Sequence, residues 1–212
     1  MYIFSRRVQM SGAHARKSTK WAVEQVGRVN SISGLEFSLW ADTYGPRVGS
    51  LLFSTMVPDL ATMLAATNTL MASDDYLKSI EQGSEYMVGH PEDTLIQIVN
   101  EMTDPGKEVN FVAVVSAVIA EGNFGRAPGI CLEIADRASK ITGLPTLFGV
   151  DTTGCYGGVR WITGASDIAE VEHANAALAT DASFTSYLDH DANGCFAEEP
   201  ALTQQELLRR IA

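Results

Sequence analysis

The chain repeats itself, and this internal repeat limits the possible folds more than any other feature of the sequence. Residues of the same type recur at a nearly constant separation, which drifts from 110 residues for Gly12 and Gly122 to 107 residues for Asp74 and Asp181. The other matched pairs are Arg16 and Arg126, Gly34 and Gly143, Gly49 and Gly157, Thr55 and Thr163, and Asp59 and Asp167. We therefore predict two copies of one structural unit, residues 1–102 and 107–212, joined by the short link 103–107.

The hydrophobic pattern predicts the same order of elements in both copies, because strands alternate apolar and polar residues and helices place apolar residues on one face. The first copy is expected to have strands at 2–10, 35–40, 47–56 and 94–99, with helices at 15–29, 58–71 and from 74 onward. The second copy is expected to have strands at 110–121, 146–151, 159–163 and 206–211, with helices at 128–141, 167–179 and 184–195. Each copy is thus β-α-β-β-α-β, the ferredoxin-like arrangement.

The bare face of each predicted sheet needs a cover. A ferredoxin-like sheet has helices on one face only, and an uncovered second face would expose apolar side chains. The strand near residues 111–119 is apolar on both faces, which indicates burial on both sides. We predict an α+β fold, in which the antiparallel sheets of two ferredoxin-like repeats pack face to face as an intramolecular α+β barrel.

The second half of each copy resembles a known superfamily. The first copy has the helix 59–71, the break Ser73-Asp74-Asp75-Tyr76 and the strand 95–99, and the second copy has Asp181 and Phe184 at the same break. This pattern resembles the dimeric α+β barrel proteins, also called antibiotic-biosynthesis-monooxygenase-like, over nearly the whole chain as two fused copies. The resemblance implies that fold. The superfamily includes cofactor-free monooxygenases, haem-degrading enzymes, chlorite dismutases, muconolactone isomerases and proteins without assigned activity, so the fold does not select a function.

Composition and charge exclude several classes of protein. A net charge of −11 without a basic tract fits poorly to a phosphate backbone, so we expect no nucleic-acid partner. No apolar run reaches the ~20 residues of a membrane helix, and the N-terminus lacks a secretory pattern, so we expect no membrane partner and a cytoplasmic location. Cys131, Cys155 and Cys195 show no metal-binding spacing. We expect no metal site and no disulfide, with each cysteine a small buried hydrophobic residue.

A haem site is the first cofactor to consider. Similarity to the haem degraders would require an asparagine, a tryptophan and a histidine, and the second copy offers Asn110, Trp161 and His190. The spacing of His190 departs from theirs, and Asp189 and Asp191 beside it favour a charged imidazolium over a neutral ligand. We expect no cofactor, with haem as the alternative.

A pocket for a small organic molecule is the leading functional hypothesis. A cofactor-free monooxygenase needs an enclosed apolar pocket with aromatic walls, and we place it between the sheet and the helices of the second copy. The candidate ligand-binding residues are aromatic or polar, and all but one belong to the second copy: Trp161, Tyr156, Tyr187, His190, Asp151 and, in the first copy, Trp40. Trp40 is expected to lie on the strand of the first copy that matches the strand of Trp161. No catalytic residue is assigned. The compound is expected to be flat or acidic. The alternative is a non-catalytic assembly protein, for which a homo-oligomer is expected.

Strand alternation and helix starts give more local predictions. Trp161 and Arg160 face opposite sides of one strand, and we place Trp161 on the side that the helices cover. Arg160 then needs an acidic partner. Asp59 and Asp167 are expected to cap the helices that follow them rather than to act in catalysis.

Arginines on the predicted strands leave two interpretations open. The set comprises Arg6, Arg7, Arg47, Arg160, Arg209 and Arg210. One interpretation is an anion-binding cavity for a carboxylate or enolate. The other is a set of interior ion pairs with nearby acidic residues, or arginines at strand ends that reach solvent.

Overall fold

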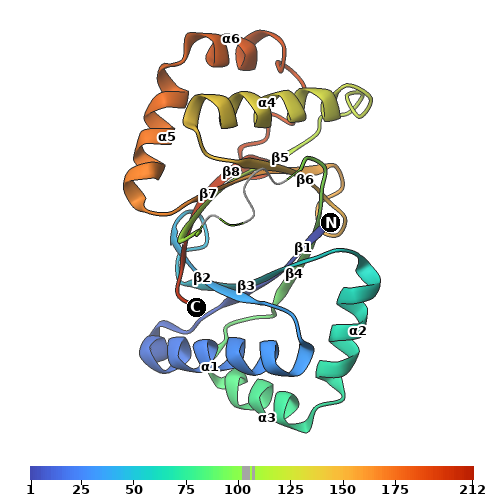
Figure 1. The fold of residues 1–212 in the computed structure, drawn as a ribbon, viewed down its shortest axis with the longest axis vertical. Coiled ribbons are helices and arrows are strands. Elements are labelled where there is room, and N and C mark those ends of the chain that lie inside the picture. The colour runs from blue at the N-terminus through green and yellow to red at the C-terminus, as the bar shows by residue number, and fades with distance from the viewer. Residues whose placement is uncertain (102–105, 107) are drawn as a thin grey trace. The chain divides into compact units, whose positions relative to one another are not determined.

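The structure of the protein is a computed structural model that describes residues 1–101, 106 and 108–212 (Figure 1). The chain divides into two compact units, which we call unit 1 (Met1–Ile96 and Arg209–Ala212) and unit 2 (Gln97–Leu208). The predicted link 103–107 lies outside the described residues, apart from Gly106. No helix in the described ranges is both long and apolar enough to cross a membrane.

Unit 1 contains the first repeat. Its elements are β1 (Tyr2–Gln9), α1 (Ala15–Ser33), β2 (Ser38–Tyr44), β3 (Ser50–Val57), α2 (Leu60–Met71), α3 (Asp74–Gly83) and β4 (Glu92–Ile98), with short 3-10 turns at Gly12–His14 and Ser84–Tyr86. Strand β3 pairs antiparallel with β1 and with β2, so that Phe53 lies opposite Arg6 and opposite Leu39. Figure 1 shows α1, α2 and α3 on the same side of this sheet.

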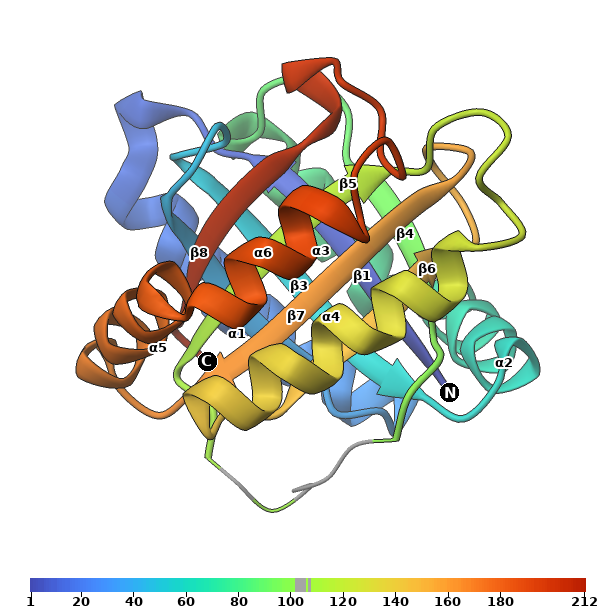
Figure 2. The same cartoon turned by 90° about the horizontal axis from the view of Figure 1, so that it is seen from above.

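Unit 2 repeats this arrangement. Its elements are β5 (Phe111–Val118), α4 (Ala127–Thr142), β6 (Thr146–Asp151), β7 (Gly158–Ala165), α5 (Ile168–Thr180), α6 (Ala182–His190) and β8 (Gln204–Arg210), with a 3-10 turn at Pro200–Leu202. Strand β7 pairs antiparallel with β5 and with β6, so that Trp161 lies opposite Val115 and opposite Phe148. Looking onto the helical face of unit 2, Figure 2 shows strand β7 between α4 and α6.

The strand order confirms the predicted fold. The eight strands of the described residues form a closed barrel in the order β1-β3-β2-β8-β5-β7-β6-β4. The order β4-β1-β3-β2 of the first repeat recurs as β8-β5-β7-β6 in the second, which is the ferredoxin-like order in both. The chain is thus an α+β protein built from two ferredoxin-like repeats.

The ends of the helices explain why the two repeats fold alike. Helices α1 and α4 end at Gly34 and Gly143, which have φ values of 70° and 71°. This left-handed conformation favours glycine. Asp59 and Asp167 directly precede helices α2 and α5, and their side chains accept hydrogen bonds from Thr62 N at 2.7 Å and Glu170 N at 2.9 Å. The predicted capping roles of both aspartates are confirmed.

Three local predictions were wrong. Arg47 lies in the turn between β2 and β3 rather than on a strand, because Gly45 and Gly49 take positive φ values of 155° and 92° there. The last predicted helix ends at His190 instead of continuing to residue 195. Trp40 was matched with Trp161, but Trp40 lies on β2, whose counterpart in unit 2 is β6 rather than β7.

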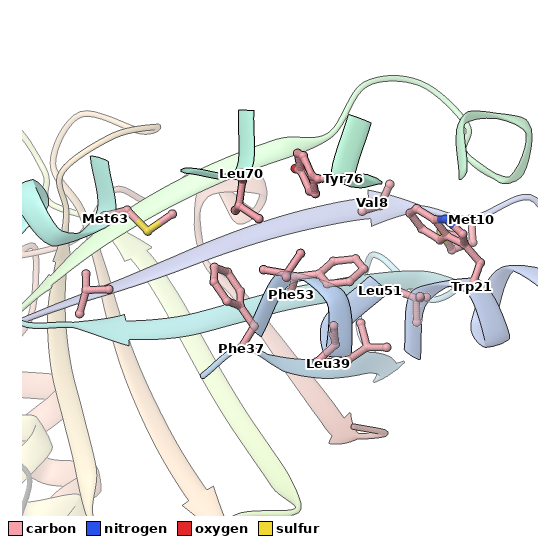
Figure 3. Close-up of a cluster of buried hydrophobic side chains, with 14 residues drawn as sticks. Val8, Met10, Trp21, Phe37, Leu39, Leu51, Phe53, Met63, Leu70 and Tyr76 are labelled. Carbon is pink, nitrogen blue, oxygen red and sulfur yellow. The ribbon is translucent and has the colours of Figure 1, made fainter. Parts of the chain in front are cut away.

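The core of unit 1 is filled by large side chains. Phe53 lies on β3, Met63, Leu70 and Tyr76 lie on α2 and α3, and Phe37 directly precedes β2. These side chains meet between the sheet and its helices (Figure 3). At Gly83 on α3, a Cβ atom would lie 2.1 Å from the ring of Trp21, so a larger residue would displace that ring. Unit 1 is therefore closely packed in its helix–sheet layer.

Candidate functional site

A cavity of about 320 Å³ lies in unit 2, between the sheet and the helices. Its walls come from β5, β6 and β7, from all three helices, and from the start of β8 and the segment before it. Most of the lining side chains are small or apolar: Ala113, Val115, Ala117, Ile134, Ala138, Leu144, Trp161, Ala165, Val171, Ala174, Leu178, Phe184, Leu188 and Phe196. The polar lining residues are Thr142, Thr146, Thr163, Asn175, Thr203 and Gln205.

The floor of the cavity is one face of the sheet. Alternate residues of a strand point to the same face, so the odd-numbered residues of β5 and β7 line it together. In register, Ala113 lies opposite Thr163, and Thr163 lies opposite Thr146 on β6. These three side chains form a row of small residues across the floor, which leaves space beneath the helices.

Trp161 forms one wall and is fixed in place. Its indole Nε1 donates a hydrogen bond to Cys131 O on α4 at 2.9 Å. Its ring centroid lies 6.2 Å from that of Phe148 and 5.5 Å from that of Phe196. Trp161 therefore faces the helices, as its position on the strand predicts.

Two threonine hydroxyls meet on the floor. Thr146 Oγ1 and Thr163 Oγ1 are 2.9 Å apart and hydrogen-bonded to each other. The hydroxyl of Thr142, also in the lining, donates to Ala138 O in its own helix at 2.7 Å. The threonine pair is thus the polar feature of an otherwise apolar floor.

The mouth of the cavity is formed by lining residues that are also exposed to solvent. These are Asn175 on α5, Leu188 on α6, and Thr203 and Gln205 near the start of β8. None of the described residues that line the cavity carries a charged side chain. The site can therefore bind apolar surface and form a few neutral hydrogen bonds, and it offers no counter-ion to a charged ligand.

Of the six candidate residues, only Trp161 lines this cavity. Asp151 is held by Arg160 through two hydrogen bonds of 2.7 and 3.1 Å. Tyr187 packs its ring 4.4 Å from the guanidinium carbon of Arg137, and burial raises the pKa of its hydroxyl. These two side chains are thus engaged elsewhere in unit 2.

The other three candidates also lie away from the lining. Tyr156 is 87% exposed in the β6–β7 turn and packs on Phe124 with ring centroids 5.5 Å apart. His190 is exposed at the end of α6, beside Ser186 O. Trp40 donates a hydrogen bond from Nε1 to Ser54 Oγ at 2.9 Å, on the sheet face opposite Leu39 and Phe53.

The lining does not fit a metal or an axially ligated haem. Within the described ranges, no three His, Cys, Asp or Glu side chains come close enough to hold a metal ion. The described lining residues include no histidine, cysteine, tyrosine or methionine that could bind iron. Burial raises the pKa of the nearby Cys131 thiol to about 12, which keeps it protonated and unreactive. Cys195 is also buried, whereas Cys155 is exposed, contrary to expectation.

Three of the arginines on strands form ion pairs. Arg6 binds Asp93 through Nε and Nη2, each at 2.7 Å, and Arg7 binds Asp42 at 2.9 Å. Together with the Arg160–Asp151 pair, these contacts favour the ion-pair interpretation over an anion-binding cavity.

A second hollow lies on unit 1 and has a different character. This groove of about 430 Å³ lies along α1 and α3 and includes Lys17, Lys20, Glu24, Glu81 and Glu85 in its lining. Exposed charges of both signs alternate there, so the groove does not favour one ligand.

Sequence reasoning missed the small residues that create the cavity. Thr55 and Thr163 are matched between the repeats, and they lie opposite Phe4 and Ala113 on the neighbouring strands. The sequence signal for the cavity was therefore the replacement of a large residue in the first repeat by a small one at the matched position of the second.

Comparison with solved structures supports the fold described above. No family model and no curated protein matches this chain. A proposed monooxygenase from Fusobacterium nucleatum has 10% identity and a TM-score of 0.71, over 100% of this chain and 92% of that one. An anthrone oxidase-like protein has 7% identity and a TM-score of 0.65, over 100% and 91%. A proposed chlorite dismutase has 12% identity and a TM-score of 0.57, over 100% and 96%.

These structures match the chain from end to end, including both repeats. The chain has the monooxygenase-like α+β barrel fold, as two fused copies. Proteins with different names share this α+β barrel fold, so the fold alone does not give the reaction.

Proposed function

We propose that unit 2 binds a small, flat and largely apolar organic compound in its cavity, without a metal or haem cofactor. The observation that carries this proposal is the volume of about 320 Å³ enclosed by apolar side chains. Ligand pockets of proteins begin at roughly 300 Å³ and are mostly apolar with a few polar groups. Empty apolar cavities also cost stability, so a cavity of this size favours a binding role.

The lining residues favour one of the two classes of ligand, flat or acidic, that the sequence left open. An acidic compound would be buried with its charge unpaired, because no described lining residue is cationic. A flat neutral compound could instead stack against Trp161 and lie on the row of small residues. We therefore favour a neutral aromatic compound over a carboxylic acid.

Oxidation of the bound compound by molecular oxygen is the second candidate function. The names of the proposed monooxygenase and the anthrone oxidase-like protein favour it. In such a reaction, a CH2 group and O2 would give a carbonyl group and water, so that no other oxidant is needed. Oxygen uptake by the full-length protein with an added aromatic substrate, followed by mass spectrometry of the product, tests this candidate.

The binding proposal is tested by filling the cavity. The full-length protein is titrated with naphthalene in a calorimeter, and we expect saturable binding of one molecule per chain. Ala113→Phe places a ring in the cavity and should abolish naphthalene binding. The position matches that of Phe4, whose ring packs against the core of unit 1.

The control is Ala179→Phe, which adds the same ring on the exposed face of α5 and should bind naphthalene like the parent protein. Absence of binding by the parent protein, or equal binding by Ala113→Phe, would contradict the proposal. A Soret band in the visible spectrum of the purified protein would instead favour the haem alternative.

A further inference from the structure

We infer that the cavity selects aromatic compounds that carry one neutral oxygen, a hydroxyl or a carbonyl group, and that the Thr146–Thr163 pair binds this oxygen. The inference rests on the proposed binding function and adds the polar group by which the site recognises its ligand. It assigns both threonines a specificity role, not a catalytic one.

The hydrogen-bonding capacity of the pair supports this role. Two hydroxyls hold two protons, and their mutual hydrogen bond of 2.9 Å uses only one of them. Among the described residues, neither hydroxyl has another hydrogen-bond partner. Thr146 is only 4% exposed, so water outside the cavity does not reach it freely. One donor and several acceptor sites thus remain for a ligand on an apolar floor.

The other polar lining groups do not compete for this role. Thr142 donates its proton to Ala138 O, so its hydroxyl is already engaged. Asn175, Thr203 and Gln205 are exposed at the mouth, where water satisfies them. A ligand that fills the cavity therefore meets the threonine pair on its floor.

Unit 1 shows that the pair is not required by the sheet. Thr55 is the counterpart of Thr163, is 4% exposed, and has a hydroxyl oxygen without a hydrogen-bond partner among the described residues. Phe37, three residues after Gly34, stands where Thr146 stands three residues after Gly143. Strands β2 and β3 pair from Ser38 opposite Ser54 onward without a threonine pair beside them, and the pair occurs in the unit that has the cavity.

A neutral oxygen fits the site better than a charged one. No described lining residue is cationic, so a phenolate or carboxylate would lose its hydration without gaining an ion pair. A phenol can donate to one threonine and accept from the other, and a ketone or quinone can accept the free proton. The ligand class is thus a neutral phenol or aromatic ketone.

The experiment compares two probes of the same shape. Naphthalene and 2-naphthol are titrated into the full-length protein, Thr146→Val and Thr163→Val. Valine keeps the shape of threonine and removes the hydroxyl. We expect either substitution to weaken 2-naphthol binding about fivefold, as for the loss of one hydrogen bond, and to leave naphthalene binding unchanged. Thr180→Val is the matched control, because it removes a helix hydroxyl that bonds Ala176 O outside the lining, and it should change neither affinity.

The outcomes separate this inference from the proposed function. Naphthalene binding combined with valine variants that bind both probes equally more weakly, or both as tightly as the parent protein, would show that the pair has no specificity role. The cavity would then still bind aromatic compounds. If the parent protein binds neither probe, both proposals are wrong. Thr146→Ser keeps the hydroxyl and should retain the preference for 2-naphthol. If a valine variant fails to fold, Thr163→Ala is measured instead. Loss of its preference for 2-naphthol over naphthalene would support the specificity role, and an unchanged preference would contradict it.

Discussion

The two repeats share a backbone plan and differ in what fills the layer between sheet and helices. Both have the same strand order, and Gly34 and Gly143 end their first helices in the same conformation. Asp59 and Asp167 cap their second helices in the same way. The positions of one repeat can therefore be matched to those of the other through the strand register and these helix ends.

At the matched positions, unit 1 has the larger side chains. Phe4, Val8, Val57, Val29 and Phe37 of unit 1 correspond to Ala113, Ala117, Ala165, Ala138 and Thr146 of unit 2. The rings of Phe4 and Phe37 meet edge to face, with centroids 6.1 Å apart. The same positions in unit 2 line the cavity. A duplicated fold can thus keep a filled core in one copy and open a cavity in the other by shortening a few side chains.

The largest effect is expected from removing a ring in unit 1. Phe37→Ala should lower the free energy of unfolding by about 3–5 kcal/mol, because Phe37 is buried in a filled core and its loss leaves a void. Thr146→Ala at the matched position should cost only about 1 kcal/mol, because the side chain already borders a cavity.

Denaturant unfolding of the two variants measures this difference. Chemical denaturation followed by circular dichroism gives both free energies. Equal losses would mean that the two layers are packed alike, and the comparison between the units would then be wrong.

The fold could be predicted from the sequence because the duplication repeats the residues that begin and end its helices. Gly34 and Gly143 are needed at a left-handed position, and Asp59 and Asp167 satisfy free backbone N–H groups, so each marks a boundary in both copies. The strand predicted at 47–56 starts at Ser50 instead, because Val48 extends the apolar pattern to the other side of Gly49 and alternation alone does not locate a turn.

The candidate site could be predicted only in part. Strand alternation places Trp161 under the helices, but the cavity depends on which residues lie opposite one another across the strands. Matching Trp40 with Trp161 paired the wrong strands and hid the correspondence of Phe4 with Ala113. Small residues give no signal by themselves, because a cavity is defined by the atoms that neighbouring residues lack.

A second comparison concerns matched aspartates on β2 and β6. Asp42 and Asp151 both lie on the sheet face away from the helices of their own unit. Asp42 forms an ion pair with Arg7 of β1, whereas Asp151 forms one with Arg160 of β7. The side chains of Arg7 and Arg160 are 9% and 23% exposed, so the pair in unit 1 is the better shielded from water.

An intermediate effect is expected from neutralising these aspartates. Asp42→Asn should cost about 3 kcal/mol, because it leaves the Arg7 charge buried with a weaker partner. Asp151→Asn should cost about 2 kcal/mol, because water can reach part of Arg160. Thermal unfolding at pH 7 ranks the two variants. A larger loss for Asp151→Asn would reverse the order that burial predicts and would point to a further role for that carboxylate.

The smallest loss of stability is expected when a helix-capping aspartate is removed. Its dependence on pH distinguishes a contribution of the carboxylate charge from a contribution of packing. The Thr62 backbone N–H donates to the Asp59 carboxylate and lowers its pKa from the usual 3.8. Because the pKa is lower in the folded state, this carboxylate stabilises the fold above about pH 4, and the contribution is lost as the pH falls through the folded pKa. Asp59→Ala should therefore lower the Tm by about 2–4 °C at pH 7 and by much less at pH 3. At pH 7, Asp167→Ala gives the matched measurement of Tm in unit 2, where the cap has the same geometry. A loss of Tm in Asp59→Ala that stayed constant between pH 7 and pH 3 would show that this side chain contributes through packing and not through its charge.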